Sequence, residues 1–317
     1  MAGLPMKNDE NAFDVLGLGA VAVDDLIYVE SYPPPDNKVP VLRRERHCGG
    51  LTATALVAAA RLGARCSYAG VLGSDELSEF VVRVLKGEAI DVSHLVRQEG
   101  ARPVHSIIIV DEGQKTRNIF FDLHGVTGAH DELPEPETVR KARVLLVDHL
   151  GIKGMNRAAE IAREAGVPVV ADLENNESPY FAHLLALVDH LILSRPFATR
   201  LTGENEPGEA ARRLWSQNRK VVIVTCGADG CWYLGERWES PIHQPAFVVK
   251  AVDTTGCGDV FHGAYAWGLT GGLDLSSRVR FASAAAALKA TQAGGQQGIP
   301  SRKTVEGFLK GERGNGN

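Results

Sequence analysis

The stretch DTTGCGDVFHGAY, from Asp253 to Tyr265, places a glycine-rich turn, a carboxylate and the start of a helix at one point in the chain. A helix N-terminus offers unpaired N–H groups and the positive end of a dipole, and glycines let the backbone approach an anion closely. The turn therefore predicts an oxyanion or phosphate site. Asp259 follows in the first helical turn, where a carboxylate can also do no more than complement the helix dipole.

The segments before this stretch alternate between apolar strands and amphipathic helices. Continuous apolar runs such as ARVLLV are separated by helical patterns such as MNRAAEIAREAG. Strands that are apolar on both faces are typical of a parallel sheet covered by helices on both sides. The sequence predicts a three-layer α/β/α core with a mostly parallel sheet, in a single domain over residues 1–317.

Two segments, near 24–47 and 103–123, depart from this rhythm. Both contain strands with alternating polar and apolar residues, as expected for strands exposed on one face, and the second turns around residues 112–115. We expect the two pairs to form one small β-sheet lid above the core. Apolar stretches such as SIIIV and NIFF on an exposed sheet also predict a homodimer formed through the lid.

The amino-acid composition argues against several kinds of binding partner. The chain has 34 Lys and Arg against 39 Asp and Glu, with no basic run interleaved with aromatic residues, which argues against a nucleic-acid partner. Its five cysteines include no C-x-x-C pair, which argues against a disulfide framework or a zinc site and fits a reducing cytoplasm. No apolar signal segment or membrane-length run is visible, so a cytoplasmic location and no membrane partner are expected.

DTTGCGDVFHGAY closely resembles the C-terminal signature of the ribokinase-like (PfkB) carbohydrate kinases. HCGGLTATALVAAARLGARCSYAGVLGSDELSEFV resembles the N-terminal signature of that family, and VIVTCGADGC resembles its nucleotide segment, in the same order. The resemblance covers nearly the whole chain and implies a ribokinase-like fold and an ATP-dependent sugar kinase. Among subfamilies, VRFASAAAALKATQAGGQQGIP and ALVDHLILSRPFATRLTG look most like sulfofructose kinases, with ketohexokinases next.

This resemblance implies roles for the residues at the phosphoryl-transfer end. Asp259 would be the catalytic base that accepts the proton of a primary hydroxyl on a ketose-like sugar. The N–H groups of Gly256, Cys257 and Gly258 would form the anion hole that holds the transferring phosphoryl group. Cys257 replaces the usual alanine, and we expect it to contribute its backbone and not a reactive thiol.

On the sugar side, Asp24 matches the position of the family's sugar-binding aspartate. Its neighbour Asp25 is expected to point to the opposite face of the strand, toward solvent. Gly49 and Gly50 would let a helix start close to the sugar, although as a plain helix-entry turn they would have no such role. Thr54 stands where the family often has a sugar-contacting asparagine.

Cationic side chains of the lid are candidates for binding a phosphate or an anionic sugar. Arg117 lies where the family often has an arginine on the phosphate side. The candidates for binding the distal acid group of an anionic sugar are Lys38, Arg43, Arg46 and Arg117. The alternative is that Lys38, Arg43 and Arg46 are solvated charges on an exposed lid strand.

For the nucleotide, Thr225 and Gly227 end an apolar strand, which is where open α/β sheets bind ligands. Ala287 and Thr291 are candidates for contacts to the purine. The implied cofactors are ATP and Mg²⁺, with a monovalent cation such as K⁺ as a further one.

The metal ligands are not identified by the sequence. Many relatives place Mg²⁺ with an N-x-x-E motif, and this chain has Ser194 and Phe197 at the matching positions. Two histidines near the expected site, His149 and His262, are predicted to be structural or adjacent to the substrate.

Three alternatives stay open. The string GLGAVA, with Gly17, Gly19 and Ala22, matches the G-x-G-x-x-A motif of NAD-dependent oxidoreductases, although β-type alternation follows it in place of the required helix. A nucleoside kinase of the same fold would share most of the motifs. A protein that binds a sugar or nucleotide without turnover is the third, against which the intact Asp259 argues.

Overall fold

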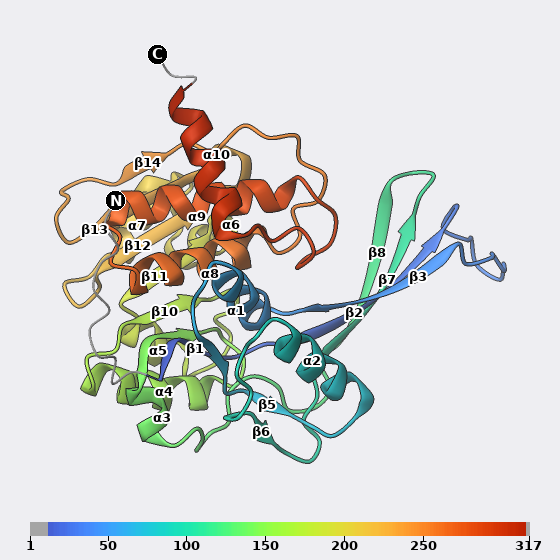
Figure 1. The fold of residues 1–317 in the computed structure, drawn as a ribbon, viewed down its shortest axis with the longest axis horizontal. Helices are drawn as coiled ribbons and strands as arrows, with labels where there is room; N and C mark the ends of the chain where they lie inside the picture. The colour runs from blue at the N-terminus through green and yellow to red at the C-terminus, as the bar shows by residue number, and fades with distance from the viewer. Residues whose placement is uncertain (1–11, 315–317) are drawn as a thin grey trace.

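The computed structural model describes residues 12–314 and shows an α/β core from which a separate sheet projects (Figure 1). The core strands are β1 (Phe13–Leu18), β4 (Cys66–Tyr68), β9 (Ala142–Val147), β10 (Val169–Asp172), β11 (His190–Ser194), β12 (Val221–Thr225), β13 (Cys231–Gly235) and β14 (Ile242–Gln244). Their order is β14-β13-β12-β11-β10-β9-β1-β4. The strands from β12 to β4 pair in parallel, and β13 and β14 add an antiparallel edge. The mostly parallel sheet is confirmed.

Helices cover both faces of this sheet because its strands are apolar on both faces. In β9, Val144 and Leu146 pack into one hydrophobic core, and Leu145 and Val147 pack into the other. The helices that share the first core are α1 (Leu51–Arg61), α2 (Glu76–Gly87), α8 (Cys257–Thr270), α9 (Leu275–Ala290) and α10 (Arg302–Gly314). The helices that share the second core are α3 (Pro136–Arg140), α4 (Ile152–Glu164), α5 (Phe181–Leu187), α6 (Arg195–Thr202) and α7 (Pro207–Leu214). The three-layer α/β/α architecture is therefore confirmed.

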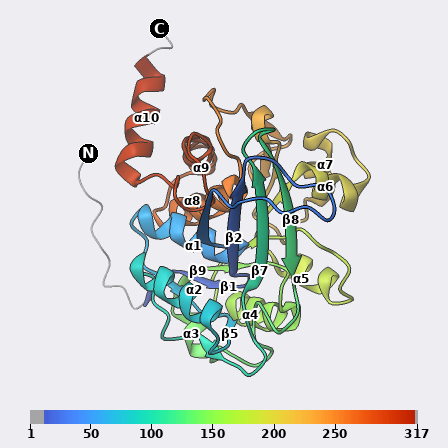
Figure 2. The ribbon, with the colours of Figure 1, turned by 90° about the vertical axis from the view of Figure 1, so that its right-hand side faces the viewer.

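The projecting sheet is the predicted lid. It consists of β2 (Ala22–Val29), β3 (Arg43–Gly49), β7 (Val104–Asp111) and β8 (Thr116–Asp122), in the order β3-β2-β7-β8. Figure 2 shows β2, β7 and β8 side by side in front of the core. Two short strands, β5 (Val71–Leu72) and β6 (Val96–Arg97), form a further small sheet, and η1 (Gly227–Asp229) is a single 3₁₀ turn.

The chain crosses from the core into the lid between β1 and β2, within three residues. Gly19 has a φ of 146°, and a Cβ there would lie 2.1 Å from Oδ2 of Asp148, so only glycine fits. The carboxylate of Asp148, which follows β9, accepts hydrogen bonds from the Ala20 N–H at 2.6 Å and the Thr52 hydroxyl at 2.9 Å. Of the glycines of GLGAVA, Gly17 thus lies within β1, and Gly19 makes the crossing between two strands. Because no helix follows them, the oxidoreductase alternative is wrong.

Candidate active site

The predicted anion loop forms a tight turn at the N-terminus of α8. Gly256 is the N-cap with a φ of 76°, and a Cβ there would lie 3.0 Å from the Gly295 carbonyl oxygen. A Cβ at Gly258 would meet no atom within 4 Å, so open space lies in front of this residue. The Cys257 N–H donates to the Thr254 carbonyl at 3.2 Å. Among residues 12–314, the N–H groups of Gly256 and Gly258 have no acceptor, which leaves them available to an anion.

Asp253 ties this loop to the end of α9. Its carboxylate accepts hydrogen bonds from the Thr255 N–H and the Gly294 N–H, both at 2.9 Å. Its own N–H donates to the Ala290 carbonyl at 3.1 Å. These hydrogen bonds hold the loop in place, as an anion hole requires.

Asp259 lies half-buried in the first turn of α8, next to the open face of the loop. Burial raises the pKa of its carboxyl well above the ordinary range, and the negative charges of Asp172, Glu174 and Asp148 raise the pKa further, while Lys289 opposes them. A raised pKa makes a carboxylate a stronger base, so this environment suits a group that must accept a proton.

The raised pKa predicts a pH dependence. Asp259 accepts a proton only when it is ionised, so kcat/KM should fall as the pH drops through its raised pKa. Glu174 is exposed, and its charge is one cause of the shift. The substitution Glu174→Gln should therefore move the acidic limb of the pH–rate profile to lower pH. Glu177→Gln, an exposed neighbour three residues away, is the matched control, and an equal shift in both variants would contradict the assignment.

Two acidic residues of the site carry no sequence motif. Asp148 is fully buried, and burial raises the pKa of its carboxyl to about 6. Asp172 is the last residue of β10 and lies 3.2 Å from Nδ1 of His262. Their position at the carboxyl ends of apolar parallel strands is the available signal, because ligands of open α/β sheets bind there.

The two histidines have different surroundings. His262 is buried, and its ring nitrogens face the carbonyl oxygens of Gly258 at 2.8 Å and Ile192 at 3.1 Å. It therefore joins α8 to β11 beside Asp259. His149 has a buried Nδ1 without a hydrogen-bond partner in the described residues, and burial lowers the pKa of its ring.

On the lid, the predicted sugar-side residues come together. Gly49 pairs with Ala22 in the sheet, and a Cβ at Gly49 would lie 2.9 Å from Oδ2 of Asp24, so this glycine makes room for that carboxylate. Burial raises the pKa of Asp24, and a hydrogen bond from the Ser106 hydroxyl opposes this. Gly50 is the N-cap of α1 with a φ of 94°. Asp24 thus lies close to the start of α1.

Thr54 lies in the interior instead of on an open sugar site. Its side chain is buried, and its hydroxyl accepts a hydrogen bond from Nε2 of Gln296 at 3.3 Å. Its methyl group lies 3.4 Å from where a Cβ of Gly256 would be. The described contacts connect Thr54 to the anion loop.

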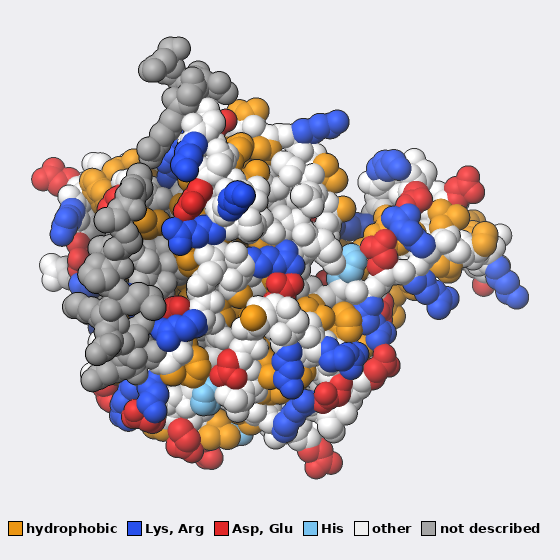
Figure 3. Space-filling model, viewed as in Figure 1, with side chains coloured by type: hydrophobic (Ala, Val, Ile, Leu, Met, Phe, Trp, Pro, Cys, Tyr) orange, Lys and Arg blue, Asp and Glu red, His pale blue; other side chains and the backbone are white. Residues whose placement is uncertain are grey.

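Arg117 joins the lid to the anion loop. It shares one face of the lid with Asp24. Asp24 and Tyr28 are four residues apart on β2 and so point to the same face. Tyr28 is paired with Val110 of β7, which is paired with Arg117 of β8. Its Nη1 donates to the Thr255 hydroxyl at 3.0 Å. Lys38, by contrast, is exposed in the connection between β2 and β3. Figure 3 shows the lid projecting from the core, with basic, acidic and hydrophobic side chains on its surface.

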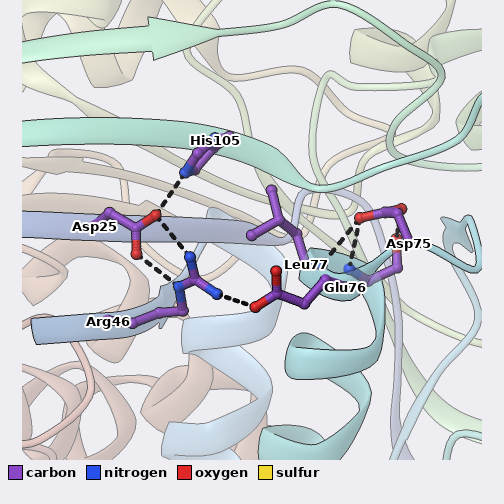
Figure 4. A network of polar contacts seen from close by, with 7 residues as sticks. Asp25, Arg46, Asp75, Glu76, Leu77 and His105 are labelled. Carbon is purple, nitrogen blue, oxygen red and sulfur yellow. Dashed lines mark hydrogen bonds and ion pairs between the residues drawn. The ribbon is translucent and has the colours of Figure 1, made fainter.

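The expectation that Asp25 faces bulk solvent is wrong. Asp25 binds Arg46 through two hydrogen bonds, of 2.6 and 3.0 Å, and its carboxylate also lies 2.9 Å from Nε2 of His105 (Figure 4). Arg46 further contacts Glu76, the first residue of α2, at 2.7 Å. This network lies on the face of the lid opposite to Asp24 and connects the lid to α2, so Arg46 is neither free for an anionic sugar nor simply solvated.

Arg43 is also committed to other groups. It forms ion pairs with Glu45 and Glu112, and its guanidinium lies 3.5 Å from the centre of the Tyr28 ring. The hydrogen bonds that Arg43 donates to Glu112 and Glu45 raise its pKa, so this side chain is always charged but already neutralised.

The predicted nucleotide residues lie at the carboxyl end of β12 and on α9. Thr225 is the last residue of β12 and pairs with Ser194, and Gly227 follows with a φ of 57° and open space at its Cβ position. Ala287 is half-buried on α9, and Thr291 is its C-cap, with its hydroxyl donating to the Leu288 carbonyl at 2.6 Å.

The residues that replace N-x-x-E do not form a metal site. Ser194 is exposed, whereas Phe197 is buried and packs edge to face against Phe181. Within residues 12–314, no group of three or more His, Cys, Asp or Glu side chains is placed to hold a metal ion. Mg²⁺ usually keeps several waters and binds through one or two carboxylates plus substrate phosphates, and Asp172 and Glu174 offer such carboxylates.

A doubly wound core, an anion loop at a helix N-terminus, an adjacent carboxylate with a raised pKa and a lid that contacts this loop define a phosphotransferase of small molecules. Residues 14–302 match the model of the pfkB family of carbohydrate kinases. The chain belongs to this family and is an ATP-dependent sugar kinase.

Individual relatives agree with this assignment. A ribokinase of Haemophilus influenzae is 28% identical over 92% of this chain and 97% of its own length. A fructokinase of Solanum tuberosum is 27% identical over 83% and 86%. The structure of Arabidopsis thaliana ribokinase complexed with ribose and ATP has a TM-score of 0.83 and 25% identity, covering 94% of this chain and 99% of that one.

The helices of residues 12–314 include none with the length and apolar character needed to cross a membrane.

Proposed function

We propose that this kinase transfers the γ-phosphoryl group of ATP to a primary hydroxyl of a ketose-like sugar, with Asp259 as the general base. The observation that carries the proposal is the half-buried Asp259 with a raised pKa, one residue beyond the open Gly258. A primary hydroxyl projects from the sugar ring and can approach such a base to hydrogen-bond distance.

In the proposed reaction, the proton of the sugar hydroxyl passes to Asp259 as the sugar oxygen bonds to the γ-phosphorus. The bond between that phosphorus and the β,γ-bridging oxygen breaks, and ADP leaves. The N–H groups of Gly256 and Gly258 hold the phosphoryl oxygens, since both lack an acceptor in the described chain. Mg²⁺ would neutralise phosphate charge when bound. We also propose that the activity depends on a monovalent cation such as K⁺.

Asp24 is the proposed anchor for the sugar, with Gly49 and Gly50 providing the space beside it. Arg117 is proposed to lie over the phosphate, because it already contacts Thr255 in the anion loop. Thr225, Gly227, Ala287 and Thr291 are proposed to line the nucleotide.

The sugar substrate is either neutral or carries an anionic group at the end far from the reacting hydroxyl. The resemblance to sulfofructose kinases suggests an anionic distal group, which would need a free cation in the lid. Arg43 and Arg46 are paired with carboxylates, and Arg117 contacts the anion loop, so Lys38 is the remaining candidate. We therefore favour a neutral ketose, with an anionic sulfosugar as the alternative.

A substrate panel tests this proposal. ADP release should be measured with neutral ketoses, aldoses, sugar phosphates, sulfosugars and nucleosides at equal concentrations. We expect the highest kcat/KM with a neutral ketose. A preference for ribose or for a nucleoside would contradict the ketose proposal but leave the kinase assignment intact.

The lid provides a second test of sugar charge. If the best substrate is an anionic sugar, Lys38→Glu should raise its KM far more than the KM of a neutral sugar. Lys115→Glu, in the turn between β7 and β8, is the control for a charge change at the lid surface. Equal effects on both sugar classes would support the neutral ketose.

We also propose that the protein is a homodimer formed through the lid. Large apolar side chains are exposed on this sheet, among them Ile119 (49%), Phe120 (55%) and Phe121 (67%). Exposed apolar patches of this kind mark association surfaces. Sedimentation of the full chain measures its mass in solution, and a monomer at micromolar concentration would contradict the dimer.

A further inference from the structure

The buried side chain of Lys289 lies next to the anion loop and has no role in the reaction described so far. It is on α9, its exposure is 0%, and it is among the largest fully buried side chains of the described residues. Lysine is almost never fully buried unless its charge is paired. This ammonium group therefore needs a physical explanation.

Within residues 12–314, the hydrogen-bond partner of Nζ is the main-chain carbonyl of Asp253, at 2.9 Å, and no carboxylate lies at ion-pair distance. Asp253 is the residue that anchors the anion loop through the Thr255 and Gly294 N–H groups. The charge of Lys289 is still felt nearby, since it acts to lower the pKa values of Asp253, Cys257 and Asp259. A buried positive charge thus lies beside the loop without an acidic partner of its own.

We propose that Lys289 is a positioning residue for phosphoryl transfer, whose missing counter-charge is the γ-phosphoryl group bound at the anion loop. Its ammonium group holds the Asp253 carbonyl, which fixes the loop, and adds positive charge beside the group that the loop binds. This inference rests on the proposed function of the loop and extends it to a residue outside the DTTGCGD motif.

The position of the charge is consistent with this role. Bringing the negative γ-phosphoryl group into a site near Asp148, Asp172 and Asp259 is opposed by their like charges. A buried cation offsets this repulsion more strongly than an exposed one, because solvent screens it less. Burying the ammonium group costs folding free energy, so its presence is explained better by function than by stability.

The substitution Lys289→Met tests the proposal, because methionine keeps the length and apolar stem of the side chain and removes its charge. Ala285 and Ala290, four residues before and one residue after this position on α9, are small and buried, and the flexible methionine can adapt to such surroundings. We expect kcat to fall by about 10²-fold, the loss typical of removing one stabilising group from an oxyanion site. The KM for the sugar should stay within twofold of wild type, and the melting temperature should be unchanged or higher.

A binding measurement makes the test independent of the sugar. Titration calorimetry with Mg·ATP and with Mg·ADP gives the ratio of the two Kd values, which reports on the γ-phosphate alone. Lys289→Met should raise the Kd for Mg·ATP about tenfold and leave the Kd for Mg·ADP within twofold of wild type. Lys220→Met, which removes an exposed lysine paired with Glu236 at 2.6 Å, is the matched control and should leave both Kd values unchanged.

Chemical rescue separates charge from structure. In Lys289→Ala, added methylammonium should restore part of the lost kcat, whereas tetramethylammonium, which has no N–H donor, should not. If Lys289→Met keeps both kcat and the ATP-to-ADP ratio within twofold of wild type, the inference is wrong. It is equally wrong if the losses accompany a lower melting temperature and methylammonium restores nothing.

The outcome is separable from that of the proposed function. A wild-type chain that phosphorylates no ketose would end the substrate proposal, yet the ratio of ATP to ADP affinity would still decide the role of Lys289. A wild-type ketose kinase with an unaffected Lys289→Met variant would end this inference alone.

Discussion

Replacing Asp259 by asparagine should lower kcat by about 10²- to 10⁴-fold, the range that general-base catalysis contributes. Asparagine has the same shape as aspartate but cannot accept a proton at neutral pH, so the sugar hydroxyl loses its base. The loss should appear in kcat and in kcat/KM equally, because the interaction with the base is made in the transition state. ATP binding should be retained or slightly improved, since one negative charge near the γ-phosphate is removed.

The measurement is steady-state ADP release with the best sugar of the panel, together with calorimetric titration of Mg·ATP. Asp131→Asn, which changes an exposed aspartate in the connection before α3, is the control for the same chemical change elsewhere. A kcat above about half of the wild-type value in Asp259→Asn would remove Asp259 as the base, because the smallest expected loss is far larger.

Gly258→Val is expected to lower turnover by a different route. A Cβ at this position meets no protein atom within 4 Å, so the variant should fold, but its side chain would occupy the space in front of the loop. We expect the clash between this side chain and the phosphoryl group to cost about 1–3 kcal/mol of binding free energy, by analogy with methylenes inserted into a packed core. The Kd for ATP should therefore rise by roughly ten- to a hundredfold, at 1.4 kcal/mol for each tenfold change.

The two variants should differ in a way that identifies each role. Asp259→Asn should bind ATP normally and transfer its phosphoryl group far more slowly, whereas Gly258→Val should bind ATP roughly ten- to a hundredfold more weakly. Gly87→Val is the control, because Gly87 is exposed at the end of α2 and its Cβ position is likewise open. Normal ATP turnover in Gly258→Val would show that the phosphoryl group does not bind in front of this loop.

Local patterns carried most of the prediction of the fold. Apolar runs such as ARVLLV identified buried parallel strands, because both faces of such strands must be covered. Alternating polar and apolar residues identified the lid, and the structure places its strands at Ala22–Val29, Arg43–Gly49, Val104–Asp111 and Thr116–Asp122. The antiparallel edge strands β13 and β14 were not predicted, since short strands at a sheet edge have a weak local pattern.

Pairings between distant segments were not predictable in the same way. Asp25 and Arg46 are 21 residues apart, and their ion pair depends on the register of β2 against β3, so sequence alone left Asp25 as a solvated residue. The carboxylate of Asp148 accepts hydrogen bonds from Ala20 and Thr52, which lie far from it in the sequence, and no spacing rule connects these residues. Such contacts are set by how the strands are ordered in the sheet.

The sequence by itself determined the α/β architecture, the lid and the glycine-rich turn before Asp259, because periodicity, turn chemistry and helix N-termini are local properties of the chain. Tertiary structure alone decided which charges are free. It paired Arg43 and Arg46 with carboxylates, placed Arg117 against Thr255, and buried Lys289 beside Asp253. The physical reason is that burial and charge pairing depend on which distant segments meet, and these in turn set the electrostatics of the site.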